Sequence, residues 1–71
     1  MDNELITVQK ELGERLRKIR ERARLTQAQV ASEAGVDHNY YARIERGVAN
    51  PSLEKLYRVM KVLKIKSLVI R

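Results

Sequence analysis

Four side chains between residues 38 and 43 carry hydrogen-bonding groups that could recognise nucleic-acid bases. Asn39 can accept from N6 and donate to N7 of adenine as a pair, and Arg43 can donate to both O6 and N7 of guanine. Tyr40 can donate its hydroxyl to a phosphate or pack its ring on a thymine methyl, and His38 adds a further polar group. The competing interpretation is four ordinary exposed residues on a short helix. Which one holds depends on the elements that carry them.

Little in the sequence could support catalysis or a metal site. The chain has no cysteine, a single histidine and no glycine-rich phosphate loop. Its carboxylates fall at positions that suit pairing on a helix surface rather than acid–base chemistry. We therefore expect no enzymatic activity, no metal, no cofactor and no small-molecule ligand.

Residues 26–47 are the most informative segment, because they predict two short helices joined by a tight turn. Val30 gives the first helix an apolar face, and the small Ala31 lets the second helix cross close to it. Gly35 breaks the first helix, since a residue that leaves a helix often needs a positive φ. Ile44 anchors the second helix. This pattern is typical of a helix-turn-helix, whose second helix fits a DNA major groove.

Two further helices flank this pair. The first begins near Asn3 or Thr7 and ends at about Arg22, because apolar residues recur at three- and four-residue steps. Its apolar positions are Leu5, Val8, Leu12, Leu16 and Ile19. The last helix follows Ser52, and its predicted buried stripe is Leu53, Leu56, Val59, Met60 and Leu63. Residues 64–71 could form a short helix or an extended arm. The two central helices are predicted at residues 27–34 and 38–46, with Thr26 and Asp37 as N-caps. The fold class is all-α, a compact bundle of four to five short helices without strands.

Length and charge limit the possible partners. The 71 residues suffice for one small domain, and a formal net charge of +6 favours a polyanionic partner. The alternative is that the excess charge serves solubility. The longest apolar run, residues 68–70, is too short for a membrane span or a secretory signal. We expect a cytoplasmic protein with no membrane association.

The matching motifs extend beyond a generic helix-turn-helix. They are Thr26-Gln27, Ala34-Gly35-Val36, Ile44-Glu45-Arg46-Gly47 and Asn50-Pro51-Ser52-Leu53. With these motifs the chain resembles the phage repressor and Cro type of helix-turn-helix domain over residues 12–65. This family also includes restriction–modification controller proteins and has the fold of the lambda repressor DNA-binding domain. Two positions depart from its pattern. Tyr41 replaces the usual Ile or Val, so either the core is larger there or the hydroxyl reaches the surface. Lys64 replaces a common glycine.

The resemblance implies a role for particular residues. The predicted base contacts, on the N-terminal half of the second central helix, are His38, Asn39, Tyr40 and Arg43. The predicted phosphate contacts, at helix ends, are Gln27, Arg46 and Asn50. Arg20 and Glu45 are expected to form a structural salt bridge between the first and third helices.

The implied function is a transcriptional regulator that binds double-stranded DNA as a homodimer on a palindromic operator. It could be the autoregulatory controller of a restriction–modification system. Residues 64–71 are the predicted dimerisation segment, because their side chains are too apolar to be left in water at a chain end. The predicted dimer contacts are Ile65, Leu68, Val69 and Ile70. The alternative is an antitoxin or a protein-binding adaptor with the same fold, which would need a docking segment outside the domain.

Overall fold

The computed structural model describes residues 3–66, which form four helices and no strand. The helices are α1 (Asn3–Arg22), α2 (Gln27–Ala34), α3 (His38–Arg46) and α4 (Leu53–Val62). This confirms the predicted all-α class and the predicted bounds of the two central helices. No fifth helix begins by residue 66.

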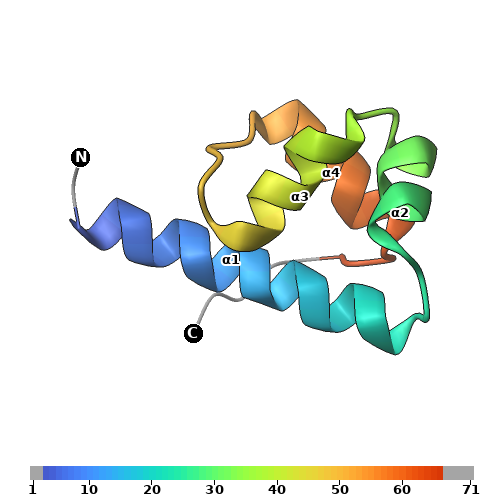
Figure 1. The fold of residues 1–71 in the computed structure, drawn as a ribbon, viewed down its shortest axis with the longest axis horizontal. Helices are drawn as coiled ribbons and strands as arrows, with labels where there is room; N and C mark the ends of the chain where they lie inside the picture. The colour runs from blue at the N-terminus through green and yellow to red at the C-terminus, as the bar shows by residue number, and fades with distance from the viewer. Residues whose placement is uncertain (1–2, 67–71) are drawn as a thin grey trace.

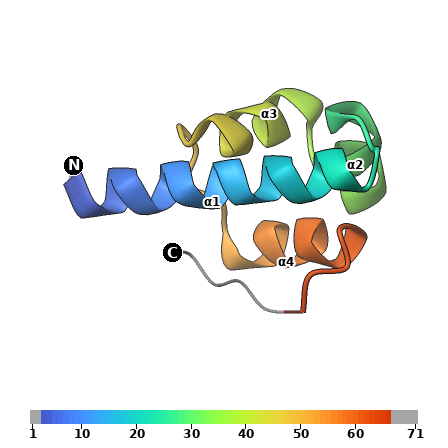
Figure 2. The ribbon, with the colours of Figure 1, turned by 90° about the horizontal axis from the view of Figure 1, so that it is seen from below.

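The long α1 forms the base on which the shorter helices are arranged (Figure 1). α3 lies along α1, and α2 packs on both α3 and α4. Turned by 90°, the molecule has α3 and α4 on either side of α1, with α2 beside the end of α1 (Figure 2). The first turns of α1 extend past α3 (Figure 1).

The core draws on every helix. Its five largest fully buried side chains are Leu16 from α1, Val30 from α2, Tyr41 and Ile44 from α3, and Val59 from α4. Burying apolar surface of this kind supplies the main driving force for folding. Tyr41 is wholly buried, and its hydroxyl has no hydrogen-bond partner among the described residues, so the core is larger here and the hydroxyl does not reach the surface.

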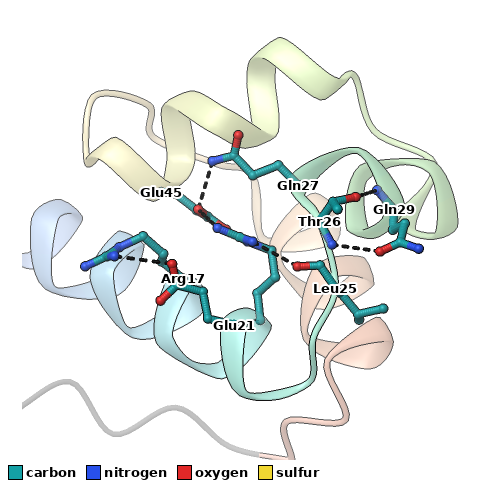
Figure 3. A network of polar contacts seen from close by, with 8 residues as sticks. Arg17, Glu21, Leu25, Thr26, Gln27, Gln29 and Glu45 are labelled. Atoms are coloured by element: carbon teal, nitrogen blue, oxygen red, sulfur yellow. Dashed lines mark hydrogen bonds and ion pairs between the residues drawn. The ribbon is translucent and has the colours of Figure 1, made fainter.

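The helix ends follow the predicted caps. Thr26 accepts a hydrogen bond from the Gln29 amide at 3.0 Å, and the Gln29 side chain accepts one from the Thr26 amide at 2.8 Å (Figure 3). This reciprocal pair is a capping box. Asp37 caps α3 by accepting from the Tyr40 amide, and Ser52 caps α4 by accepting from the Lys55 amide. Gly35 ends α2 with φ 71°, which a side chain with a Cβ would disfavour.

The predicted buried stripe of α4 was wrong at one position. Leu53 is 82% exposed, because it is the first residue of α4 and projects away from the core. Of the apolar positions in the first two turns of α1, Leu5 and Val8 are exposed. Instead, α1 buries Gln9 and Gly13 together with its central leucines.

Candidate nucleic-acid interface

α3 presents its predicted reading residues on one side and its core anchors on the other. His38 and Asn39 are the first two residues of the helix, and both are exposed. Arg43 is exposed one turn after Asn39, on the same face, because residues four apart in a helix are neighbours. Tyr41 and Ile44 are buried on the opposite side. The polar face is thereby fixed by the packing of the apolar one.

Tyr40 joins this face to α4. Its ring packs against the core, and it is only partly exposed. The guanidinium carbon of Arg43 lies 5.9 Å from the ring centroid, and the ammonium of Lys55 lies 4.5 Å from it. Both distances suit cation–π contacts. The sequence reasoning missed Lys55, because it lies fifteen positions beyond Tyr40 and no short-range spacing connects the two.

Two of the three predicted phosphate contacts lie at helix ends and the third lies in a loop, and they differ in how firmly their side chains are held. Gln27, the first residue of α2, is half-buried, and its Nε2 donates to Glu45 Oε1 at 2.9 Å (Figure 3). Arg46 is the last residue of α3 and is exposed. Asn50 is exposed in the segment between α3 and α4. Among these three, only Gln27 hydrogen-bonds to another side chain within residues 3–66.

Arg20 and Glu45 form a bidentate ion pair between α1 and α3. Arg20 Nε donates to Glu45 Oε2 at 2.7 Å, and its Nη2 donates to Oε1 at 3.0 Å. Its Nη1 donates to the Leu25 carbonyl at 2.9 Å, which ties the turn after α1 to the same group. The Glu45 side chain is only 2% exposed and that of Arg20 12% exposed. The pair is therefore largely withdrawn from water.

Opposing effects set the protonation of this cluster. Burial alone would raise the pKa of the Glu45 carboxyl, but the hydrogen bond from Arg20, the nearby Tyr41 hydroxyl and the Gln27 amide together lower it. Burial raises the pKa of Tyr41, and the Glu45 carboxylate raises it further. The Tyr41 hydroxyl lies near that carboxylate without meeting hydrogen-bond geometry. Glu45 is thus the charged centre of a cluster in which Tyr41 stays neutral.

A close approach of backbones sets the position of α3 on α1. A Cβ at Gly13 would collide with the carbonyl oxygens of Ile44 and Glu45. α1 and α3 therefore approach one another at the residue that carries the buried carboxylate. The apolar periodicity did not single out Gly13, because a glycine inside a helical pattern carries no hydrophobic signal. Its presence despite the helix-propensity cost of glycine was the available clue.

Of the predicted dimer contacts, only Ile65 lies within the described residues. It is partly buried and packs against the core of its own chain. Leu68, Val69 and Ile70 lie outside the described residues. Lys64 adopts φ 60°, so the backbone keeps a left-handed residue where the resemblance leads one to expect glycine. Within residues 3–66, no helix is both long and apolar enough to cross a membrane.

Comparison with known proteins identifies relatives of the same kind. A family model described as helix-turn-helix matches residues 16–70. The immunity repressor protein of Bacillus phage phi105 is 43% identical over 54 residues, which cover 76% of this chain and 38% of that protein. An uncharacterised HTH-type transcriptional regulator of Mycobacterium tuberculosis is 33% identical over 58 residues, 82% of this chain and 41% of that protein. This chain thus spans well under half the length of these curated relatives.

A solved structure has a closely similar fold. It is the crystal structure of a tyrosine-to-phenylalanine mutant of the restriction–modification controller protein C.Esp1396I. The two folds superpose with a TM-score of 0.78 at 26% sequence identity, over 93% of this chain and 80% of that one. The likeness therefore includes nearly all of the four-helix arrangement.

Proposed function

Because the chain belongs to the phage repressor and Cro type of helix-turn-helix family, we propose that it is a sequence-specific, DNA-binding transcriptional regulator. Membership in this family supports DNA-binding transcriptional regulation as the general function. The observation that carries the proposal is the exposed face of α3, where His38, Asn39 and Arg43 stand opposite a fully buried anchor. Such a helix can enter a major groove without disturbing the core. This role belongs in the cytoplasm, with the DNA.

The proposed base contacts are His38, Asn39, Tyr40 and Arg43. Arg43 and Asn39 share a face of α3 and have the paired hydrogen-bonding groups that distinguish guanine and adenine. Asn39 and Arg43 are both exposed, and Arg43 forms no ion pair within residues 3–66. They are therefore free to meet base edges, and we assign sequence choice mainly to these two.

The proposed phosphate contacts are Gln27, Arg46 and Asn50. One N–H of the Gln27 amide donates to Glu45, which leaves the second N–H to donate to a phosphate oxygen. The free amides at the start of α2 would add to this contact, since helix N-termini favour anions. Contacts of this kind fix the position of the protein on the duplex but carry little sequence information.

Sequence choice divides testably between these two groups. Replacing Arg43 by Ala should cost about 1–3 kcal/mol of binding free energy on the operator and narrow the preference over unrelated DNA. Replacing Gln27 by Ala should weaken binding to operator and unrelated DNA by similar factors. Selection of binding sites from random DNA, followed by affinity measurements, separates the two. If Arg43→Ala selects the same consensus as the unaltered protein, with unchanged information content at every base, then α3 does not read the sequence.

A homodimer on a palindromic operator is the proposed functional form. A single short helix in one groove gives too few base contacts for strong selection, and two copies about 34 Å apart double them. Residues 64–71 are the proposed pairing segment, with contacts from Ile65, Leu68, Val69 and Ile70. Because Ile65 is partly buried against its own core, we expect Leu68, Val69 and Ile70 to supply most of the dimer contacts.

Sedimentation at micromolar concentration should give about twice the chain mass of 8.3 kDa. Replacing Leu68 by Glu should shift the protein to monomer, because a charge in an apolar interface is costly to desolvate. Lys61→Gln changes the net charge by the same single unit on the exposed side of α4 and serves as the control. A monomer for the unaltered chain that Leu68→Glu leaves unchanged would rule the segment out.

The more specific form of the proposal is an autoregulatory controller of a restriction–modification system. The fold likeness to a restriction–modification controller protein supports it, over 93% of this chain. The neighbouring DNA tests it directly. An inverted repeat upstream of the gene would support autoregulation, and adjacent methyltransferase and nuclease genes are expected. Phage structural or integration genes in their place would instead favour an immunity repressor.

A further inference from the structure

Lys55 occupies a position on α4 that its own helix does not favour. It lies in the first turn, where its amide donates to the Ser52 cap at 3.2 Å. A cation there faces the positive end of the helix dipole, which is electrostatically unfavourable. Glu54, its neighbour, offers no relief, because that carboxylate pairs with Arg58 at 2.8 Å. The sequence therefore keeps a positive charge at a site where local helix energetics oppose it.

The side chain of Lys55 is directed to α3 rather than to an acidic partner. Its ammonium lies 4.5 Å from the centroid of the Tyr40 ring, and the guanidinium of Arg43 approaches the same ring. No ion pair joins Lys55 or Arg43 to a carboxylate within residues 3–66. Asp37, the N-cap of α3, accepts from the Tyr40 amide. Two cations thus lie against one aromatic ring, and neither has an ion-pair partner in the part of the chain that the structure describes.

Two like charges beside one ring repel each other, so the arrangement favours an anion that contacts both. The Tyr40 ring offsets part of this repulsion through its electron-rich face. It cannot neutralise either charge, and both cations remain exposed. A phosphate is the anion that a groove-bound α3 would bring to this position, because the DNA backbone borders the bases that the helix reads.

We propose that Tyr40 holds Lys55 beside Arg43, so that Lys55 donates to a DNA phosphate adjacent to the base contacts of α3. This inference rests on the proposed function, in which α3 enters the major groove. Lys55 is then a contact residue, and Tyr40 acts through its ring as a positioning residue. The phosphate contact belongs to α4 and the base contacts to α3, so the ring couples the two helices at the interface.

The salt dependence of binding tests the role of Lys55. Each phosphate contact contributes about 0.9 to the slope of log K against log salt concentration. In the proposed homodimer Lys55→Gln removes two phosphate contacts, so we expect the slope to fall by about 1.8 on both the selected operator and a random-sequence duplex. The advantage of the unaltered protein over the variant should then shrink about 12-fold between 50 and 200 mM salt. Fluorescence anisotropy on both duplexes gives these values.

Lys61→Gln is the matched control, since it removes the same charge from a later, exposed position on α4. Its slope should equal that of the unaltered protein. Equal slopes for all three proteins would overturn the inference while leaving the proposed function intact, as would equal losses for the two variants. If the unaltered protein binds neither duplex at 50 mM salt, the proposed function itself fails.

The role of Tyr40 is tested by variants that keep or remove the ring. Tyr40→Phe should retain the slope of the unaltered protein. Tyr40→Leu should lower it as Lys55→Gln does, and adding Lys55→Gln to Tyr40→Leu should then change the slope little further. If the role of Tyr40 is merely structural, Tyr40→Leu would alter stability and leave the salt slope unchanged. If the double variant instead lowers the slope by the sum of the two single-variant decreases, Tyr40 does not position Lys55.

Because Tyr40 packs on the core, Tyr40→Leu could impair folding, and a second measurement avoids that problem. In the unaltered free protein, the ring current of Tyr40 should move the NMR signals of the Lys55 Cε protons upfield of those of Lys61. Random-coil positions for the Lys55 signals would show that the ammonium is not held over the ring. That result would overturn the positioning role without any variant.

Discussion

Replacing Glu45 by Ala should lower the free energy of unfolding by about 3–5 kcal/mol. The carboxylate is almost completely buried, and it holds both the Arg20 guanidinium and the Gln27 amide. Its removal leaves a largely buried cation without a counter-charge, which is the expensive outcome for a buried pair. Arg20→Ala should lower the free energy of unfolding by a similar amount, because it leaves the buried Glu45 carboxylate without its cation. Urea unfolding followed by circular dichroism measures both.

The i,i+4 pair on the outer face of α1 provides the control. Arg17 and Glu21 are 45% and 54% exposed and their charged atoms are 3.5 Å apart. Exposed pairs of this kind contribute about 0–1 kcal/mol. Glu21→Ala should therefore move the urea midpoint little. If it matches Glu45→Ala, the inner pair is solvated and does not tie α1 to α3.

The pH dependence of stability provides a second check on the same pair. The folded protein lowers the pKa of Glu45 below its ordinary value of 4.5. The stabilisation is therefore fully present above about pH 4.5 and is lost as the pH falls through the lower, folded-state pKa. The difference in unfolding free energy between the unaltered protein and Glu45→Ala should stay constant from neutral pH down to about pH 4.5. It should shrink at lower pH.

The second large effect is expected at Gly13. Gly13→Ala should destabilise the protein by about 3 kcal/mol, the upper end of the usual cost of overpacking, because the added methyl meets backbone rather than a movable side chain. On an exposed helix surface the same change would stabilise by about 1 kcal/mol through helix propensity. The sign of the effect thus reports the α1–α3 contact directly. Thermal and urea unfolding both serve as readouts.

Gly35→Ala separates this steric cost from backbone strain. A Cβ at Gly35 meets only the end of the Arg58 side chain, at 3.8 Å, but φ is 71°. Its cost should be about 1–2 kcal/mol, from the left-handed conformation alone. Gly13 has no such strain, so a loss at Gly13 larger than that at Gly35 is expected. A Gly13→Ala protein as stable as the unaltered one would contradict the close crossing.

Local signals predicted the helix-turn-helix well, because caps and breaks depend on a few neighbouring residues. Thr26 and Asp37 cap their helices, and Gly35 ends α2 in the left-handed conformation. Periodicity was weaker, since it identifies the apolar face of a helix but not how far the neighbouring helices extend along it. That is why Leu53 was placed in the core and is exposed.

Contacts between helices were predicted unevenly. The Arg20–Glu45 pair followed from the family resemblance, and the two side chains do meet. Nothing short-range in the sequence connects Tyr40 with Lys55, or Gly13 with the α3 carbonyls, because chain folding alone brings these groups together. The DNA contacts and the dimer segment remain predictions.

The placement of the Glu45 carboxylate divides the protein into parts of unequal rigidity. α1, α2 and α3 each contribute a group to that cluster, whereas α4 is held chiefly by its packing on α2. Opening any of the first three helices separates a buried charge from its partners, but α4 can lift away with those bonds intact. Backbone amides in α4 should accordingly exchange with solvent through smaller, local openings. A phosphate held by Lys55 would fasten this least secured helix, so binding DNA would slow those openings and bring α4 into the same cooperative unit as the rest.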